Sequence, residues 1–466
     1  MLQSCRHPRE SSLQRPDIVT NTPARKLAIT VIFVALLGGC DDCHTEESSA
    51  PPDVDTIDEW LDIRAQSLSD IDDLGPVMEM ADDRELILLG ESTHGTHEYY
   101  QWRAEMTLAL AEEQGIDFVG IEGDWHTARA ADQYVTGQLV AEDARQVVED
   151  AFDRWPRWMW ANSEFADFLE EIRAHNEANP EHPVRIYGID MQGFFGSLNR
   201  LVEIVAEDHP GDARRIREYL QCLNRFFPQP GQYAQAIESG ATEGCEEEIT
   251  DAVEAVGQLY DGDGIRDLSA RKHARVVASG EEQFRKRVTG GDDYFWNVRA
   301  AHMFDAVQGM LAHHGDDARG VIWAHNTHIG DARATDMSDQ GRINIGQVSR
   351  ETLGDEAVLA VGFSTQSGDV IAGNQWRSPH RSVPLPEPPK GTVDEKLSRH
   401  DDSAYFVIFD DGDAELDFWA QRPGQRAVGV VYHPAHEEHG NYVPTNPAQR
   451  YDALIYLDET TALDPL

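Results

Sequence analysis

Lysine is almost absent from this chain of 466 residues, and it occurs only at positions 26, 272, 286, 390 and 396. The 39 basic residues are therefore nearly all arginine, and they face 84 acidic residues, which gives a formal net charge of −45. A field of that sign repels phosphate backbones, which excludes nucleic acid as a partner. Dispersed carboxylates with so little lysine are typical of adaptation to high salt, where the screening length falls to about 3 Å at 1 M. An ordinary acidic protein is the alternative.

Several sequence motifs are also missing. No Gly-x-Gly-x-x-Gly follows a predicted strand, and neither a Gly-x-x-x-x-Gly-Lys-Ser/Thr loop nor a Gly-x-Ser-x-Gly elbow is present. These absences disfavour a Rossmann cofactor site, a P-loop and a serine α/β-hydrolase. The sequence also lacks a Cys-x-x-Cys or Cys/His zinc pattern. We therefore expect no structural zinc.

The longest apolar run, 27–37, is too short for a membrane span, which needs about 20 residues. It follows the basic pair Arg25-Lys26, as in a signal peptide, and it ends in Leu37-Gly38-Gly39-Cys40, which resembles a bacterial lipobox. We expect residues 1–40 to be a lipoprotein signal peptide, with Cys40 lipidated, and residues 41–56 to be a flexible tether. The mature protein would then be exported and lipid-anchored to a membrane of the cell envelope. A plain secretory signal is the alternative.

Two of the five cysteines, Cys222 and Cys245, lie far from the N-terminal region. In an oxidising compartment they would pair and close a loop of about two dozen residues, which is worth about 3 kcal/mol on chain-entropy arithmetic. Two buried free thiols are the alternative.

Short apolar runs alternate with helical patterns along much of the chain. This alternation predicts an α/β fold with a mostly parallel central sheet flanked by helices, in a domain spanning 57–466. From 196 to 315 the pattern is acidic and helical, which predicts an inserted helical subdomain. Helices are expected at 97–114 and from 126. Strands are expected at 85–90, 117–122, 184–189, 320–324, 357–362, 405–409, 427–431 and 453–457.

Polar side chains gather where four of these strands end, and ligands bind beyond the carboxyl ends of parallel strands. A lone histidine or a strand-closing Glu is often only a loop or capping residue, but His94, Glu122, His325 and His328 would share one crevice. Imidazoles beside a carboxylate can supply a general base near neutral pH, or alternatively hold a divalent metal. The planar guanidinium of Arg103 can bind a carboxylate or an oxyanion. The remaining strand-end residues expected to bind substrate are Asp124, Trp125, Asp190 and Asn326.

Blocks distributed over about 60–466 resemble those of the erythromycin esterase family. They are Gly90-Glu91-Ser92-Thr93-His94-Gly95-Thr96 with Arg103, Ile121-Glu122-Gly123-Asp124-Trp125, Trp158-Met159-Trp160, Tyr187-Gly188-Ile189-Asp190, Trp296-Asn297-Val298-Arg299 with His302-Met303, Trp323-Ala324-His325-Asn326-Thr327-His328, and Gly362-Phe363-Ser364-Thr365.

The resemblance implies an α/β core with a helical insertion. It also implies hydrolysis of the macrolactone ester of erythromycin-like macrolides, with no resident metal and no cofactor. It makes His94 the general base on water and Glu122 the residue that orients it. His325 and His328 would assist, while Arg103 and Glu91 would line the site. The resemblance leaves open which small-molecule ester is the substrate, and the sequence leaves the oligomeric state unknown. The alternatives are a metal-dependent hydrolase using the same residues and a non-catalytic lipoprotein that binds a ligand or haem.

Overall fold

The computed structural model describes residues 54–466, apart from the side chains at 288–290 and 292. The predicted signal peptide, the lipidation at Cys40 and nearly all of the predicted tether lie outside these residues. Within them, no helix is both long enough and apolar enough to cross a bilayer.

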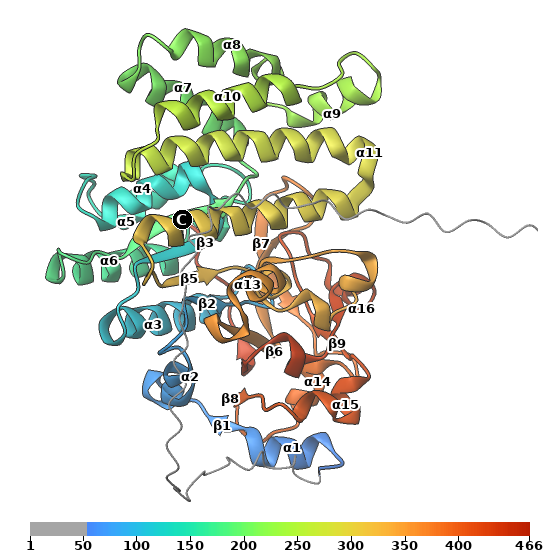
Figure 1. The fold of residues 1–466 in the computed structure, drawn as a ribbon. Coiled ribbons are helices and arrows are strands. Elements are labelled where there is room, and N and C mark those ends of the chain that lie inside the picture. The colour runs from blue at the N-terminus through green and yellow to red at the C-terminus, as the bar shows by residue number, and fades with distance from the viewer. Residues whose placement is uncertain (1–53) are drawn as a thin grey trace, which may run out of the picture. The chain divides into compact units, whose positions relative to one another are not determined.

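A nine-stranded, mostly parallel sheet lies at the centre of the domain, with the strand order β1-β8-β11-β6-β2-β5-β3-β4 and β7 paired with β6 (Figure 1). This arrangement confirms the predicted fold class. The strands are β1 Gln66–Ser67, β2 Leu86–Leu89, β3 Phe118–Asp124, β4 Arg185–Asp190, β5 Gly320–Trp323, β6 Val358–Gly373, β7 His380–Leu385, β8 Ala404–Ile408 and β11 Ala453–Thr460, and a separate pair is formed by β9 Gly424–Arg426 and β10 Tyr442–Pro444.

Helices cover both faces of this sheet, which explains why its central strands are apolar on both sides. In β2, Leu86 and Leu88 enter one hydrophobic cluster while Ile87 and Leu89 enter the other. The helices are α1 Ile57–Arg64, α2 Gly75–Met80, α3 His97–Glu113, α4 Trp125–Val135, α5 Ala144–Ala151, α6 Ser163–Ala178, α7 Phe194–Asp208, α8 Ala213–Asn224, α9 Pro230–Glu238, α10 Glu246–Leu259, α11 Ile265–His314, α12 Asn326–Ile329, α13 Ile345–Leu353, α14 Val393–Leu397, α15 Asp417–Ala420, α16 Glu437–Gly440 and α17 Pro447–Arg450.

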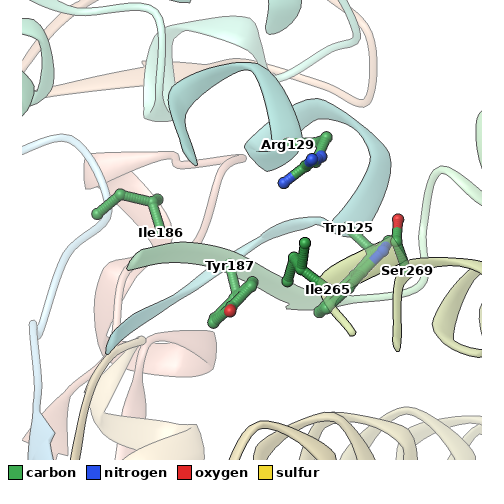
Figure 2. Close-up of a pocket in the computed structure, with 6 residues that line it drawn as sticks. All are labelled: Trp125, Arg129, Ile186, Tyr187, Ile265 and Ser269. Carbon is green, nitrogen blue, oxygen red and sulfur yellow. The ribbon is translucent and has the colours of Figure 1, made fainter. Parts of the chain in front are cut away.

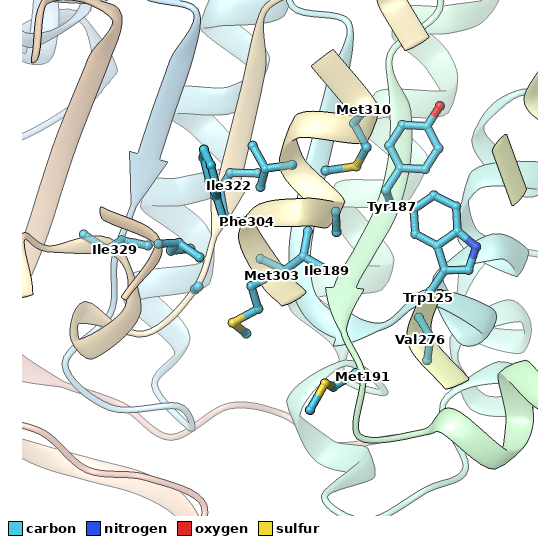
Figure 3. Close-up of a cluster of buried hydrophobic side chains, with 14 of the residues drawn as sticks. Trp125, Tyr187, Ile189, Met191, Val276, Met303, Phe304, Met310, Ile322 and Ile329 are labelled. Atoms are coloured by element: carbon cyan, nitrogen blue, oxygen red, sulfur yellow. The ribbon is translucent and has the colours of Figure 1, made fainter. Parts of the chain in front are cut away.

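The segment from α7 to α11 consists of helices, and α7 to α10 stack on the side of α11 that faces away from the sheet (Figure 1). Helix α11 folds back on itself at Gly291, where φ is 75°, a value that suits glycine. Its second half lies over β4 and β5, so that Met303 and Phe304 pack near Ile189 and Ile322 (Figure 3). A disulfide joins Cys222 of α8 to Cys245, whose Cα atoms are 5.8 Å apart.

Two strand predictions need correction. β6 continues past the predicted end at 362 to Gly373, because its second half pairs with β7 in a hairpin. The strand predicted at 427–431 is wrong. This segment makes only isolated bridges, from Val428 to Thr93 and from Val431 to Gly373, because it passes between the hairpin and the loop after β2.

Candidate active site

The loop that connects β2 to α3 carries His94, and its backbone is held from three sides. The N–H of Gly90 donates to the carbonyl oxygen of Val361 (2.9 Å), and that of His94 donates to Val428 (3.2 Å). Gly95 accepts from the N–H of Ile371 (2.9 Å), and a Cβ at this glycine would lie 2.1 Å from the Ile371 oxygen. Only glycine therefore fits there, and the loop places the adjacent His94 in a fixed position.

His94, Glu91 and Arg103 form a buried row of side chains that we call the base cluster. Nδ1 of His94 lies 2.7 Å from Oε1 of Glu91 and must carry a proton, because a carboxylate only accepts. The other oxygen of Glu91 lies 2.9 Å from Nη2 of Arg103, which is fully buried against the rings of Tyr100 and Trp323. Arg103 therefore contacts the oxygen of Glu91 that does not contact His94. It does not line the site, contrary to expectation.

The surroundings of His94 favour its protonated form. Burial acts to lower its pKa, but the hydrogen bond that His94 donates to Glu91 and the negative charge of Glu122 outweigh burial, so that the pKa is raised above its usual value. About 10% of the side-chain surface remains exposed. No described residue hydrogen-bonds its Nε2. This nitrogen is therefore the one that a water molecule or a substrate can approach.

His325 lies beside His94, with ring centroids 4.8 Å apart, but both of its nitrogens are occupied. Nδ1 accepts from the backbone N–H of Thr327 (3.2 Å) and caps α12, which leaves Nε2–H to donate to the carbonyl oxygen of Ser92 (3.1 Å). Burial and the neighbouring charge of His94 keep its pKa well below the usual value. His325 is thus neutral and structural, and it has no N–H to offer an oxyanion, contrary to expectation.

A second buried group of side chains lies at the ends of β3 and β4, and we call it the arginine cluster. Arg299 of α11 donates to Glu122 (2.7 Å), to Asp190 (3.0 and 2.7 Å) and to Nε2 of His328 (2.9 Å). Four of its five N–H groups are used in this way, and one on Nη1 remains without a contact in the described chain. Trp296 stacks on the ring of His328, with centroids 4.7 Å apart.

Arg299 also sets the charge of its two carboxylate neighbours. Burial alone would raise the pKa of Glu122, but His328 and Arg299 hold it well below the usual range. The pKa of Asp190 is likewise lowered, because Arg299 outweighs its burial. Both carboxyl groups therefore stay ionised beside the guanidinium of Arg299.

The partner of His94 is therefore Glu91, not Glu122 as we expected. β5 lies between β2 and β3, so Glu122 is two strands away from the His94 loop and acts on it only through its charge. Oε2 of Glu122 instead accepts from the backbone N–H of His325 (2.9 Å). Arg299 had no predicted role. Its signal was the block Trp296-Asn297-Val298-Arg299, but only the fold of α11 at Gly291 shows that this helix returns to the strand ends.

Three further expected residues have structural contacts. Asp124 accepts from Arg154 Nε and from the backbone N–H of Gly193, both at 2.7 Å. Both polar atoms of the Asn326 side chain bind the backbone of Phe363. Trp125 stacks on Tyr187 (5.5 Å) beside a cavity of about 10 Å³ (Figure 2), which has room for about one water molecule. Asn326 also contacts the base cluster, because its backbone N–H donates to the carbonyl oxygen of Glu91 (2.8 Å).

The described residues contain no group of three or more His, Cys, Asp or Glu side chains placed to hold a metal ion. Glu122, Asp190 and His328 come together, but the guanidinium of Arg299 occupies the space among them.

Comparisons with known proteins agree with this architecture. A Bacillus cereus protein of known structure is 18% identical, with a TM-score of 0.73 over 88% of this chain and 98% of its own. A structure described as a succinoglycan biosynthesis protein is 17% identical, with a TM-score of 0.69 over 88% and 97%. A mutant of the erythromycin esterase EreC in its open conformation is 15% identical, with a TM-score of 0.59 over 85% and 97%. The family model described as erythromycin esterase matches residues 111–460, and the chain therefore belongs to the erythromycin esterase family.

Proposed function

We propose that this protein hydrolyses a carboxylic ester, a macrolactone included, with a water molecule activated by His94. The observation that carries this proposal is the base cluster. Its Glu91 fixes the proton of His94 on Nδ1, which leaves Nε2 as a proton acceptor beside accessible space. Such a pairing orients the imidazole and stabilises the imidazolium that forms when it takes a proton.

In the proposed reaction, Nε2 of His94 removes a proton from water while the water oxygen bonds to the carbonyl carbon. The tetrahedral intermediate then expels the alcohol oxygen, which takes the same proton back from His94. The products are a carboxylic acid and an alcohol, and the base is regenerated. The remaining N–H of Arg299 is the donor that we assign to the developing oxyanion, because a fixed cation in a buried site strongly stabilises such charge.

Family membership and the fold shared with the erythromycin esterase EreC support a hydrolase, and they make macrolides the first substrates to assay. A role in macrolide resistance would follow only if a macrolide is opened.

The test is the hydrolysis of a 14-membered macrolide and of simple aryl esters by the wild type and by His94→Ala. Loss of the base should lower kcat/KM by about 10²–10⁴. The matched control is His97→Ala, since His97 makes the same 2.7 Å contact to Glu164 but is 41% exposed. If His94→Ala keeps more than about a tenth of the activity, His94 is not the base. Metal analysis of the active protein checks the alternative of metal-bound water.

We also propose that the mature protein is anchored at the cell envelope through lipidated Cys40. This rests on the lipobox-like Leu37-Gly38-Gly39-Cys40 after the apolar run. Cys40→Ser should move the protein from the membrane fraction to the soluble fraction. A variant that stays membrane-bound and unprocessed would instead indicate a membrane-spanning segment.

A further inference from the structure

Two segments that contact each other through Trp155 contain arginine but no acidic residue, and part of each is exposed. Although 84 of the 466 residues are acidic, there is no Asp or Glu in 154–163 or in 370–386. The first segment precedes α6 and the second holds the end of β6, the hairpin loop and β7. The indole rings of Trp155 and Trp376 pack edge to face with centroids 4.5 Å apart, and Trp155 Nε1 donates to the carbonyl oxygen of Ser378 (2.9 Å).

The arginines of these segments are unusual because they lack partners. Among the arginines that the structure describes, only Arg157, Arg217, Arg377 and Arg381 have side chains without a hydrogen bond, an ion pair or a ring contact, and three of the four are here. The Nε–H of Arg157 is buried and unpartnered. Arg377 has a φ of 65°, a left-handed conformation that costs energy for a residue other than glycine. We call Trp155, Arg157, Trp376 and Arg377 the arginine–tryptophan patch.

Two short stretches of chain connect the patch to the ends of the sheet strands near the site. Ile371, which donates to Gly95 next to His94, is five residues before Trp376, so their Cα atoms are at most about 18 Å apart. On the other side, Arg154 precedes Trp155 and donates to Asp124 at the end of β3. A ligand of a few sugar rings can therefore reach from the patch to His94.

The chemistry of the patch points to an anionic ring compound. The guanidinium group of arginine binds carboxylates and phosphates, and the face of an indole stacks on the apolar face of a ligand ring. Acidic side chains repel anions, so an anionic group approaches more readily at a patch that has arginines and no acidic residue. Binding to a membrane surface grows with buried apolar area, and the exposed aromatic surface here is essentially Trp376, which is 61% exposed. This favours a ligand over a bilayer.

We propose that the arginine–tryptophan patch binds an acidic sugar in the part of the substrate remote from the ester bond, while the ester lies at His94. The inference rests on the proposed hydrolysis and narrows its substrate to esters of acidic carbohydrates.

The first test measures binding alone, by calorimetry at the lowest salt that keeps the protein folded, with trigalacturonate as the acidic probe and maltotriose as the neutral one. The wild type should bind trigalacturonate at least about tenfold more tightly, and Arg157→Ala or Arg377→Ala should each weaken it about ten- to a hundredfold. Arg217→Ala, which removes an unpartnered arginine from α8, should change nothing. Equal binding of the two sugars, or retained binding in both patch variants, overturns the inference.

The second test links the patch to hydrolysis. It compares the mono-4-nitrophenyl ester of suberic acid, which ends in a carboxylate, with 4-nitrophenyl octanoate, which is neutral. Arg377→Ala should raise KM for the acidic ester alone and leave kcat unchanged. If neither ester is hydrolysed, the proposed activity is contradicted. The binding test then still shows whether the patch binds an acidic sugar. Binding to phosphatidylglycerol vesicles that Arg377→Ala abolishes, without sugar binding, would make the patch a membrane contact and overturn the inference.

Discussion

The base cluster and the arginine cluster lie close together, but they are built in different ways. The base cluster comes from one stretch of chain, 91–103, whereas the arginine cluster joins β3, β4, α11 and α12. In the first, a carboxylate raises the pKa of a partly accessible histidine. In the second, one guanidinium keeps two buried carboxylates ionised. The base cluster is therefore suited to proton transfer, while the arginine cluster also holds α11 onto the sheet.

The largest loss of stability should come from Arg299→Ala, which removes the cation of the arginine cluster. It leaves Glu122 and Asp190 buried without their cation, and breaking a buried ion pair costs about 3–5 kcal/mol. Urea unfolding should show this loss, and activity should fall as well. Arg217→Ala provides the control, because that side chain has no such contacts and should stay within about 0.5 kcal/mol of the wild type. A loss below about 1 kcal/mol for Arg299→Ala would mean that the cluster does not hold α11.

Glu122→Gln should have a smaller effect on stability, about 1–3 kcal/mol, because Arg299 keeps Asp190 as a partner. Since the folded pKa of Glu122 is lowered, its contribution is present above the unfolded value of about 4.3 and is lost as the pH falls further. The wild type should therefore lose more stability in acid than the variant, as measured by unfolding at pH 7 and pH 3. Parallel losses in both proteins would contradict this role for Glu122.

The smallest change is expected for His325→Ala, which removes the cap of α12 and the bond to Ser92. Stability should fall by about 1–2 kcal/mol, and kcat should fall because the His94 loop loosens, but the pH dependence of the rate should not move. His325→Asn, which can still cap α12, should recover part of the stability. A shifted pH profile in either variant would place His325 in proton transfer.

The sequence predicted the base cluster's residues but not their pairing. Buried strands read from apolar runs placed His94, Glu122 and Asp190 at one edge of the sheet, as the structure has them. The order of strands depends on long-range packing, so the sequence could not show that β5 separates β2 from β3. With β2 and β3 assumed to be neighbours, Glu122 is the carboxylate expected beside His94, although the structure pairs His94 with Glu91, three residues away in the chain.

Other misses have equally physical causes. A histidine at a strand end looks the same whether it caps a helix, as His325 does, or faces a substrate, because the difference lies in the neighbours of its two nitrogens. The segment 427–431 is apolar enough for a strand, but it bridges two loops and makes only isolated pairs. Arg299 belongs to the sequence block Trp296-Asn297-Val298-Arg299. Its role depends on the turn at Gly291, which brings this part of α11 back to the strand ends.

The pH dependence of kcat/KM, measured for the wild type and for Glu91→Gln, shows whether Glu91 raises the pKa of a catalytic His94. A general base works when deprotonated, and Glu91 raises the pKa of His94, so wild-type activity should rise with pH through a pKa above 6.5. Removing the charge and the strong acceptor of Glu91 should move this acid limb to lower pH and lower the plateau, with Glu122→Gln causing a smaller shift. An acid limb that stays in place in Glu91→Gln would contradict the assignment of His94 as the Glu91-tuned base.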